Sequence, residues 1–335
     1  MAKARALDRR RRSIRNTRKI TRTMELVATA QFRRAMDRAV AASSYTKRIV
    51  SLVKDLTHAG VAVTHPLLEE RKEIKKVALL VLTANRGMCG GYNANMIRLS
   101  MARWKELKEE FGDNAVLEIS GQRGVSAFRF RGIEPDCTYT HFEDKPTYDE
   151  VEELASRYIE EYYDGKIDRL EIVYTKFISM SKQEAVRETL LPMSELVSED
   201  DVLTYTPPNT TLGDGDKKTE AELRKEALIR AAQAKMNKSG SVTVREGGEI
   251  PFDFYPSAQS VMEEVVPNAF RIKLFKCLLD AGVNEQISRM IAMKAATENA
   301  DQIISALSTA YNRARQGQIT NEIIEVTSGF EALGG

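Results

Sequence analysis

The residues most suggestive of chemistry form a glycine-rich segment, Asn85-Arg-Gly-Met-Cys-Gly-Gly91, which follows a short apolar run and precedes a helical stretch. Phosphate groups often bind at this position in α/β folds, because backbone N–H groups at a helix start point toward the anion. The segment matches neither the GxGxxG fingerprint nor a Walker loop. The simpler interpretation is a tight turn that needs glycine for its backbone angles. A contact loop that presents Arg86 and Cys89 at its tip is a further interpretation.

Other residues that could support catalysis are sparse. Cys89, Cys137 and Cys277 have no CxxC spacing, which fits a reducing compartment, and Cys89 has no obvious histidine partner to activate it. The three histidines do not have metal-ligand spacing, and the carboxylates are mostly spaced as helix-surface pairs. We therefore expect no catalytic residue, no bound cofactor and no metal site of this chain's own.

The charge is distributed unevenly along the chain. The net charge is +2, but residues 1–60 hold sixteen Lys and Arg against four Asp and Glu. The run Arg9–Arg12 suggests a basic helix that binds nucleic acid, yet few aromatics interleave with it and no zipper heptads follow. An acidic protein partner is the favoured interpretation. The Arg-rich start lacks the apolar core of a signal peptide, and no apolar run reaches the length of a membrane span.

The elements at the two chain ends must position these residues. Neither 1–58 nor 283–316 contains glycine or proline, so each stretch predicts a helix much longer than usual. The first would span roughly 80 Å at 1.5 Å per residue. Its seam mixes apolar residues with many alanines, which permits close approach of one partner helix. We expect helices at 1–60 and 257–335 to form an antiparallel coiled coil.

The middle of the chain predicts a separate α/β domain at 70–205. Apolar runs that suggest strands lie at Val77–Leu82, Ala115–Ser120, Leu170–Ile178 and Val186–Pro192. Helical stretches alternate with them, which favours a Rossmann-like α/β sandwich with a largely parallel sheet. The short segment Gly121–Gly124 is expected to be a turn that closes the second strand. The C-terminal helix is expected to bend or break near Pro267 and Gly282.

Residues 206–250 predict an insertion. A loop rich in proline, glycine and aspartate at 206–216 precedes a charged surface helix at 219–238 and a possible hairpin at 241–245. The segment is too polar to belong to the main core. Since it contains no cysteine, a thiol switch within it is excluded, and we expect it to regulate through a reversible mechanical contact.

Four separated motifs resemble those of one family, the gamma subunit of rotary F-type ATP synthase. They are Ser13–Ala28, the loop Asn85–Gly91 with Met88 in place of the usual leucine, Arg289–Asn299, and Tyr311–Thr320 together with the residues up to Gly329. The resemblance covers nearly the whole chain, with the motifs in the family's order. The insertion at 206–250 departs from it, because most bacterial members have a short loop there.

The resemblance implies a central rotor shaft that couples ion flow through the membrane c-ring to ATP synthesis or hydrolysis at the beta subunits. The partners it implies are the alpha and beta subunits, the epsilon subunit and the c-ring. Catalysis would belong to the beta subunits, so this chain would be a non-catalytic subunit. It would lie peripherally at the cytoplasmic face of the bacterial plasma membrane. Whether protons or sodium ions drive it stays open.

The resemblance also assigns residues to partner interfaces, by position in the family's motifs. The predicted contact residues are Met24, Arg86, Gly87, Met88, Cys89, Gly90, Arg289, Gln316, Thr320 and Glu325. Two other classes of function remain as alternatives: an α/β nucleotide-binding enzyme with helical arms, and a nucleic-acid-binding protein with helical arms.

Overall fold

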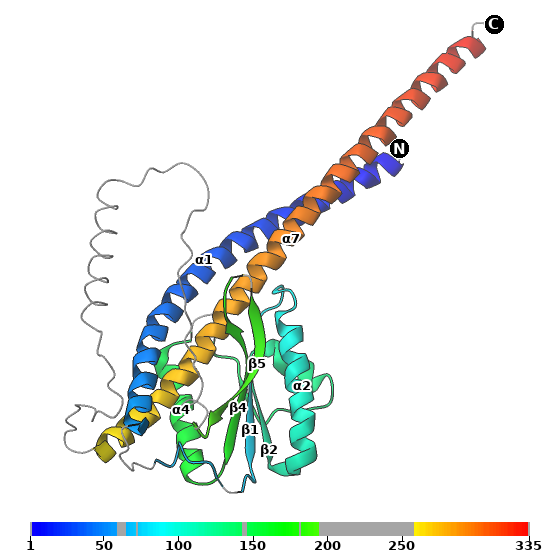
Figure 1. Ribbon diagram of the computed structural model, residues 1–335. Helices are drawn as coiled ribbons and strands as arrows, with labels where there is room; N and C mark the ends of the chain where they lie inside the picture. Colours follow the sequence, from blue (N-terminus) through cyan, green and yellow to red (C-terminus); the bar gives the residue numbers. More distant parts are fainter. Residues whose placement is uncertain are drawn as a thin grey trace, which may run out of the picture.

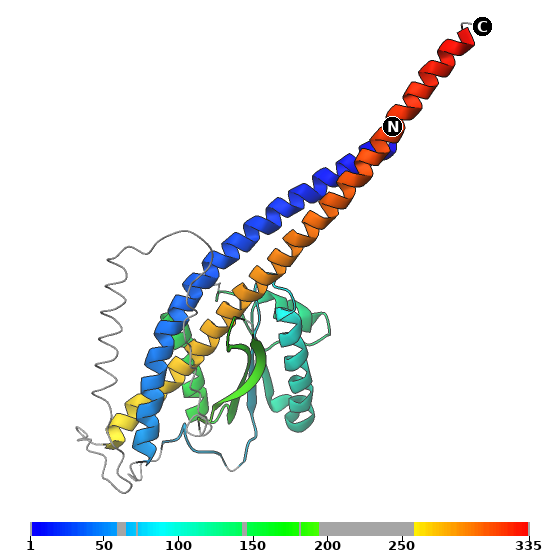
Figure 2. The same ribbon diagram turned by 45° about the horizontal axis from the view of Figure 1, so that its top comes forward.

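The computed structural model describes residues 2–58, 65–71, 73–142, 146–180, 182–193 and 258–333. Two long helices, α1 (Ala2–His58) and α7 (Ala258–Leu333), lie side by side and project from an α/β domain (Figures 1 and 2). The predicted insertion at 206–250 lies outside the described residues. Among the described helices, none is long and apolar enough to cross a membrane.

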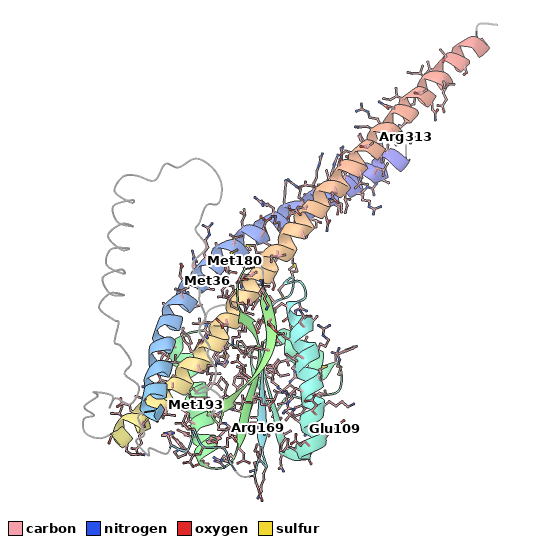
Figure 3. The ribbon with its side chains drawn as sticks, in the orientation of Figure 1. Met36, Glu109, Arg169, Met180, Met193 and Arg313 are labelled. Carbon is pink, nitrogen blue, oxygen red and sulfur yellow. The ribbon has the colours of Figure 1, made fainter. Side chains whose placement is uncertain are left out.

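The two helices form the predicted antiparallel coiled coil. Arg18 Nε of α1 lies 2.5 Å from Asp301 Oδ1 of α7, and the hydroxyls of Thr21 and Thr297 are 2.9 Å apart. Nearer the domain, an apolar cluster joins the helices, containing Phe32, Met36, Phe177, Val283 and Ile287. Figure 3 labels Met36 and also Arg313, which marks the region where α1 begins. The contact between the helices is therefore apolar next to the domain and includes polar pairs farther along.

Helix α7 is continuous over 76 residues, about 115 Å at 1.5 Å per residue. The expected break near Pro267 and Gly282 is wrong, since the helix runs through both positions. Proline removes one backbone hydrogen bond from a helix interior. Here Val266 and Phe270, on either side of Pro267, are fully buried against the sheet, and we infer that this packing offsets the loss.

The domain contains one five-stranded sheet in the order β3-β2-β1-β4-β5. Its strands are β1 (Val77–Leu82), β2 (Ala115–Ser120), β3 (Cys137–Tyr139), β4 (Arg169–Phe177) and β5 (Gln183–Leu191). The first four run parallel and β5 is antiparallel to β4. All six residues of β1 are buried, as expected for a strand covered on both faces. The sequence did not predict β3, which has only three residues and little apolar character.

Helices cover both faces of the sheet. On one face lie α2 (Tyr92–Phe111), followed by a 3₁₀ turn at Gly112–Asn114, and α3 (Gln122–Arg129). The other face is covered by α4 (Tyr148–Tyr163) and the first part of α7. The turn expected at Gly121–Gly124 is in fact the start of α3. Glycine there serves close packing, because a Cβ on Gly124 would lie 2.6 Å from the Thr83 hydroxyl.

Candidate functional site

The candidate site lies at the topological switch point of the sheet, where the strands that follow β1 in the chain are placed on opposite sides of it. From β1 the chain proceeds to β2 on one side, while β4 pairs on the other side of β1. In doubly wound folds, ligands bind in the crevice outside the carboxyl ends of such strands. Here a helix of the same chain lies in that place: Phe177, at the end of β4, packs with Val283 and Ile287 of α7. Figures 1 and 2 both show α7 between α1 and the domain.

Little space is left between α7 and the end of β1. The cavity there measures about 40 Å³, and its lining includes Thr83, Asn85, Tyr92, Ser120 and Glu285. Such a volume suits a buried water molecule, whereas small-molecule sites usually measure about 300 Å³ or more. The crevice in this structure has no room for a nucleotide.

The backbone donors at the start of α3 are also occupied. The amide of Gln122 donates to Asn85 Oδ1 at 3.0 Å, that of Arg123 to the Ala84 carbonyl at 3.1 Å, and that of Gly124 to Thr83 Oγ1 at 3.0 Å. A helix start binds phosphate through free N–H groups of this kind. Because the loop after β1 already accepts their hydrogen bonds, these amides at the start of α3 are not free to bind a phosphate.

The loop Arg86–Gly90 rests on α7. A Cβ on Gly90 would lie 3.6 Å from the Ala292 Cβ, and the φ of Gly90 is +56°. Met88 is a non-glycine residue with a φ of 62°, and its side chain is 60% exposed. A left-handed backbone is uncommon for such a residue and often marks a functional contact. Arg86 is exposed as well, so the loop offers one basic and one apolar side chain to the surroundings.

The expectation that Cys89 lies at the loop tip is wrong. Its side chain is only 2% exposed and packs with Ala84 and Tyr92. Asn93 Nδ2 donates to the sulfur at 3.1 Å. Burial, and next the negative charge of Glu285, raise the pKa of the Cys89 thiol, so the thiolate needed for nucleophilic chemistry is disfavoured. Cys89 therefore stabilises the loop from inside.

The structure brings Arg289 to the same place. Arg289 Nη2 lies 2.5 Å from Glu285 Oε1, and both side chains are nearly buried. This pair acts electrostatically on Cys89 and Tyr92. Arg289 is thus paired within α7 beside the loop, in contrast to an exposed partner contact. Residues 86–90 and Arg289 form one site, which we call the clamp.

The other predicted contact residues lie along the shaft, away from the clamp. The Thr21–Thr297 contact places half-buried Met24 near the height of residue 294 on α7. Gln316 is about 22 residues farther along α7, roughly 33 Å at 1.5 Å per residue. Gln316, Thr320 and Glu325 are exposed. Glu325 lines a groove of about 930 Å³ that Ala4, Leu7 and Arg313 also border.

The basic run of α1 is partly used inside the coiled coil. Asp8 accepts ion pairs from Arg11 at 2.7 Å and from Arg12 at 2.8 Å, and the Arg11 guanidinium lies 4.6 Å from the ring centroid of Tyr311. The contact with Tyr311 holds the start of α1 against α7. Within the run Arg9–Arg12, Arg11 is therefore used inside the chain, while the Arg12 side chain stays 75% exposed.

Comparisons with known proteins agree with this architecture. A family model described as ATP synthase matches residues 3–333. The chain is 51% identical to the ATP synthase gamma chain of Rhodopirellula baltica, with 100% of each chain covered. The gamma chain of Leptospira biflexa is 32% identical over 99% of this chain and 100% of its own length. The chain belongs to the ATP synthase gamma chain family.

Solved structures with the same fold come from ATP synthases. One chain of the Euglena gracilis mitochondrial ATP synthase, in a structure of OSCP, F1 and c-ring, aligns with a TM-score of 0.58 at 16% identity. The alignment covers 99% of this chain and 95% of the other. A rotor structure from the same organism gives a TM-score of 0.54 at 15% identity, covering 95% and 99%. At these identities the likeness concerns the fold.

Sequence reasoning missed two residues of the site. Asn284 is fully buried and donates from Nδ2 to the Thr175 carbonyl at 2.7 Å, which joins α7 to β4. Tyr92, the first residue of α2, directs its hydroxyl to the Ala281 carbonyl at 3.3 Å. A signal for Asn284 was available, because Asn284, Glu285 and Gln286 form a run of three polar residues between Val283 and Ile287.

Proposed function

We propose that this gamma chain is the central rotor shaft of its ATP synthase and transmits torque between a membrane c-ring and the catalytic beta subunits. Family membership supports the subunit assignment. The architecture supports the mechanical role, because α7 passes without a break from the sheet to the far end of the coiled coil. A continuous helix anchored in a folded domain transmits rotation, whereas a jointed connection would absorb it.

The observation that carries the proposal is the free end of α7. The Arg11–Tyr311 contact places the start of α1 near residue 320 of α7, so the last turns of α7 extend alone. Ile323, Ile324 and Val326 are 59%, 55% and 74% exposed there. A short isolated helix is only marginally stable in water, and clustered exposed apolar residues mark interaction sites. A surrounding ring of alpha and beta subunits would cover them.

The predicted contact residues take different roles under this proposal. Met24 and the exposed side chains of Arg86 and Met88 would face the ring, together with Gln316, Thr320 and Glu325 farther along α7. Gly87, Cys89, Gly90 and Arg289 would instead hold the clamp in shape. The exposed basic residues of α1 suit acidic surfaces of the beta subunits, and the long-range part of that attraction should weaken with salt.

The proposal includes the remaining partners and the location. The epsilon subunit and the c-ring would bind the α/β domain at the end opposite the free tip of α7. The subunit would then lie peripherally at the cytoplasmic face of the plasma membrane. It would contribute no catalytic residue, and no cofactor or metal, to the reaction.

Reconstitution with the alpha and beta subunits tests the proposal. The chain carries a label at Phe130→Cys, since Phe130 is 89% exposed on the domain, in a Cys137→Ser background. We expect ATP-driven rotation of the label in the immobilised complex. A complex that assembles and hydrolyses ATP with a stationary label would contradict the rotor role. Failure to assemble with alpha and beta subunits of the same organism would contradict the subunit assignment.

A further inference from the structure

A hydrogen bond joins the shaft helix to the sheet at the point where α7 leaves the domain. Asn284 Nδ2 donates to the Thr175 carbonyl of β4 at 2.7 Å and to the Asp280 carbonyl of its own helix at 2.8 Å. The Tyr92 hydroxyl of α2 points to the Ala281 carbonyl, a longer contact of 3.3 Å. Residues of β4 and of α2 therefore hold the same turn of α7 from two elements.

Burying the polar side chain of Asn284 at this turn lowers the stability of the fold. Both N–H groups of the Asn284 amide are used, which fixes its orientation and leaves Oδ1 buried without a hydrogen-bond partner. An unpaired buried acceptor destabilises a fold. Such groups in native proteins call for an explanation, and an apolar residue of similar size would avoid the cost. We infer that Asn284 contributes more to the orientation of α7 than to the free energy of folding.

Apolar packing alone defines the orientation of α7 weakly at this height. The nearby residues Val283 and Ile287 of α7 have buried aliphatic side chains, and Gly282 has no side chain. Aliphatic contacts are not directional, whereas a hydrogen bond weakens steeply as its angle departs from linearity. Because the Asn284 side chain lies off the axis of α7, a rotation of the helix about that axis moves its amide away from the Thr175 carbonyl.

We propose that Asn284, assisted by Tyr92, is a positioning residue that fixes the rotational setting of the shaft helix relative to the α/β domain. We call these two residues the key. The inference rests on the proposed rotor function for its purpose, since torque about the shaft must cross this joint. The geometry itself can be measured on the full chain without any partner.

The test uses two substitutions at the key and one matched control. Asn284→Leu removes the amide at similar size, and Tyr92→Phe removes only the hydroxyl. The control is Gln286→Leu: Gln286 is equally buried, two residues away on the same helix, and neither polar atom of its side chain has a hydrogen-bond partner. Removing its amide should therefore not loosen the joint.

Spin labels report the angle between shaft and domain. They are placed at Phe130→Cys on the domain and at Ile303→Cys on α7, both exposed, in the Cys137→Ser background. Pulsed electron resonance on the full chain should give a narrow distance distribution for the parent and for Gln286→Leu. We expect Asn284→Leu to lose the narrow distribution and Tyr92→Phe to broaden it less. A distribution as narrow in Asn284→Leu as in the parent overturns the proposal.

A second measurement connects the key to function. In the reconstituted complex, Asn284→Leu should lower ion pumping per ATP hydrolysed, while Gln286→Leu leaves the ratio unchanged. Unchanged pumping together with a broadened distribution would overturn the claim that the key transmits torque. If Asn284→Leu does not fold, as judged by its circular dichroism, Tyr92→Phe decides both points. Failure of every variant, parent included, to assemble would count against the proposed function and leave the distance result standing.

Discussion

At the scale of single residues, the loop after β1 approaches the start of α3 so closely that the fold requires glycine there. Gly121 has a φ of +98°, and a Cβ there would lie 2.0 Å from the Thr83 carbonyl oxygen. Gly124 meets the Thr83 side chain in the same way. Backbone therefore meets backbone closely at Gly121, whereas Gly87 and Gly91, in the segment that first suggested phosphate binding, face side chains.

Replacing Gly121 with alanine should be severely destabilising. The added methyl collides with backbone that cannot give way, and the backbone angle is strained for alanine, so we expect a loss of about 3 kcal/mol or more. Gly132→Ala is the matched control, because Gly132 has a φ of +74° with nothing within 4 Å of its Cβ. It should lose about 1 kcal/mol from strain alone. Equal losses of unfolding free energy for the two variants, measured by urea denaturation, would show that the close approach of Gly121 to Thr83 does not determine the cost of the substitution.

Met24→Lys should impair coupling more than folding. Met24 is half-buried on a helix whose neighbouring Arg22 already pairs with Glu25 at 2.7 Å. An added ammonium group can form a new ion pair with an acidic stator surface, strengthened where water is scarce. We expect ATP hydrolysis to continue with less ion pumping per ATP, and Met24→Leu to behave as the parent. Parental pumping per ATP in Met24→Lys would reject the idea.

At the scale of elements, α7 carries several buried polar groups where it lies against the sheet. Lys273, Lys276 and Asp280 are all under 9% exposed. Lys273 Nζ lies 3.1 Å from Glu188 Oε2 of β5, and Lys176 Nζ of β4 lies 3.3 Å from Oε1 of the same carboxylate. This network ties the base of the shaft to the β4–β5 hairpin. Asp280 belongs to it, yet its Oδ2 atom has no hydrogen-bond partner.

Asp280 should make the stability of the fold depend on pH. Burial, opposed chiefly by the charge of Lys276, raises the pKa of Asp280 from 3.8 to about 7. The native state then binds more protons than the unfolded state between these values, so the contribution of Asp280 is full below about pH 4. It declines as the pH rises to about 7. The other charges that act on it are Lys273, Lys176 and Glu188.

Asp280→Asn should remove that decline, because an amide cannot ionise. The free energy of unfolding of the parent relative to the variant should fall by up to about 4 kcal/mol between pH 4 and pH 8. Denaturant titrations across this range measure the difference, and other groups that titrate in both proteins cancel. A parent-minus-variant difference that stays flat with pH would show that folding does not raise the pKa of Asp280.

At the scale of the whole molecule, the domain and the coiled coil form one body because α7 belongs to both. The described chain on either side of residues 194–257 ends in the same core, because Met193 and Met262 belong to one apolar cluster; Figure 3 labels Met193. A segment inserted there can be shortened without separating the elements that flank it.

Replacing residues 207–250 with a short Gly/Ser linker should therefore leave folding and assembly intact. We expect it to raise ATP hydrolysis or to shorten the lag after ADP inhibition, since surface contacts of this polar segment should be weak and reversible. Hydrolysis and its lag are measured with and without reductant, and reductant should have no effect on either protein. The regulatory role fails if rate and lag equal those of the parent.

The sequence alone determined the long helices, the antiparallel coiled coil and most of the sheet. Absence of glycine and proline over 1–58 and 283–316 leaves the helix as the natural backbone structure, and β1 and β2 are apolar runs with the predicted ends. Composition also bounded the chemistry, since no residue set suited catalysis. These features are local, because propensity and periodicity act over neighbouring residues.

Only the tertiary structure decided what occupies the crevice. By its sequence, the glycine-rich loop is compatible with a bound phosphate or with a packed helix beside it. Helix α7 excludes the phosphate, because it fills the space beside Tyr92 and Phe177. Burial of Cys89, the pairing of Arg289 with Glu285, and the bond from Asn284 to Thr175 all follow from that placement. They join residues about 100 to 200 positions apart, or depend on such contacts, and no local pattern specifies which distant segment arrives. The role of each polar residue on α7 is therefore set by the surface that buries it.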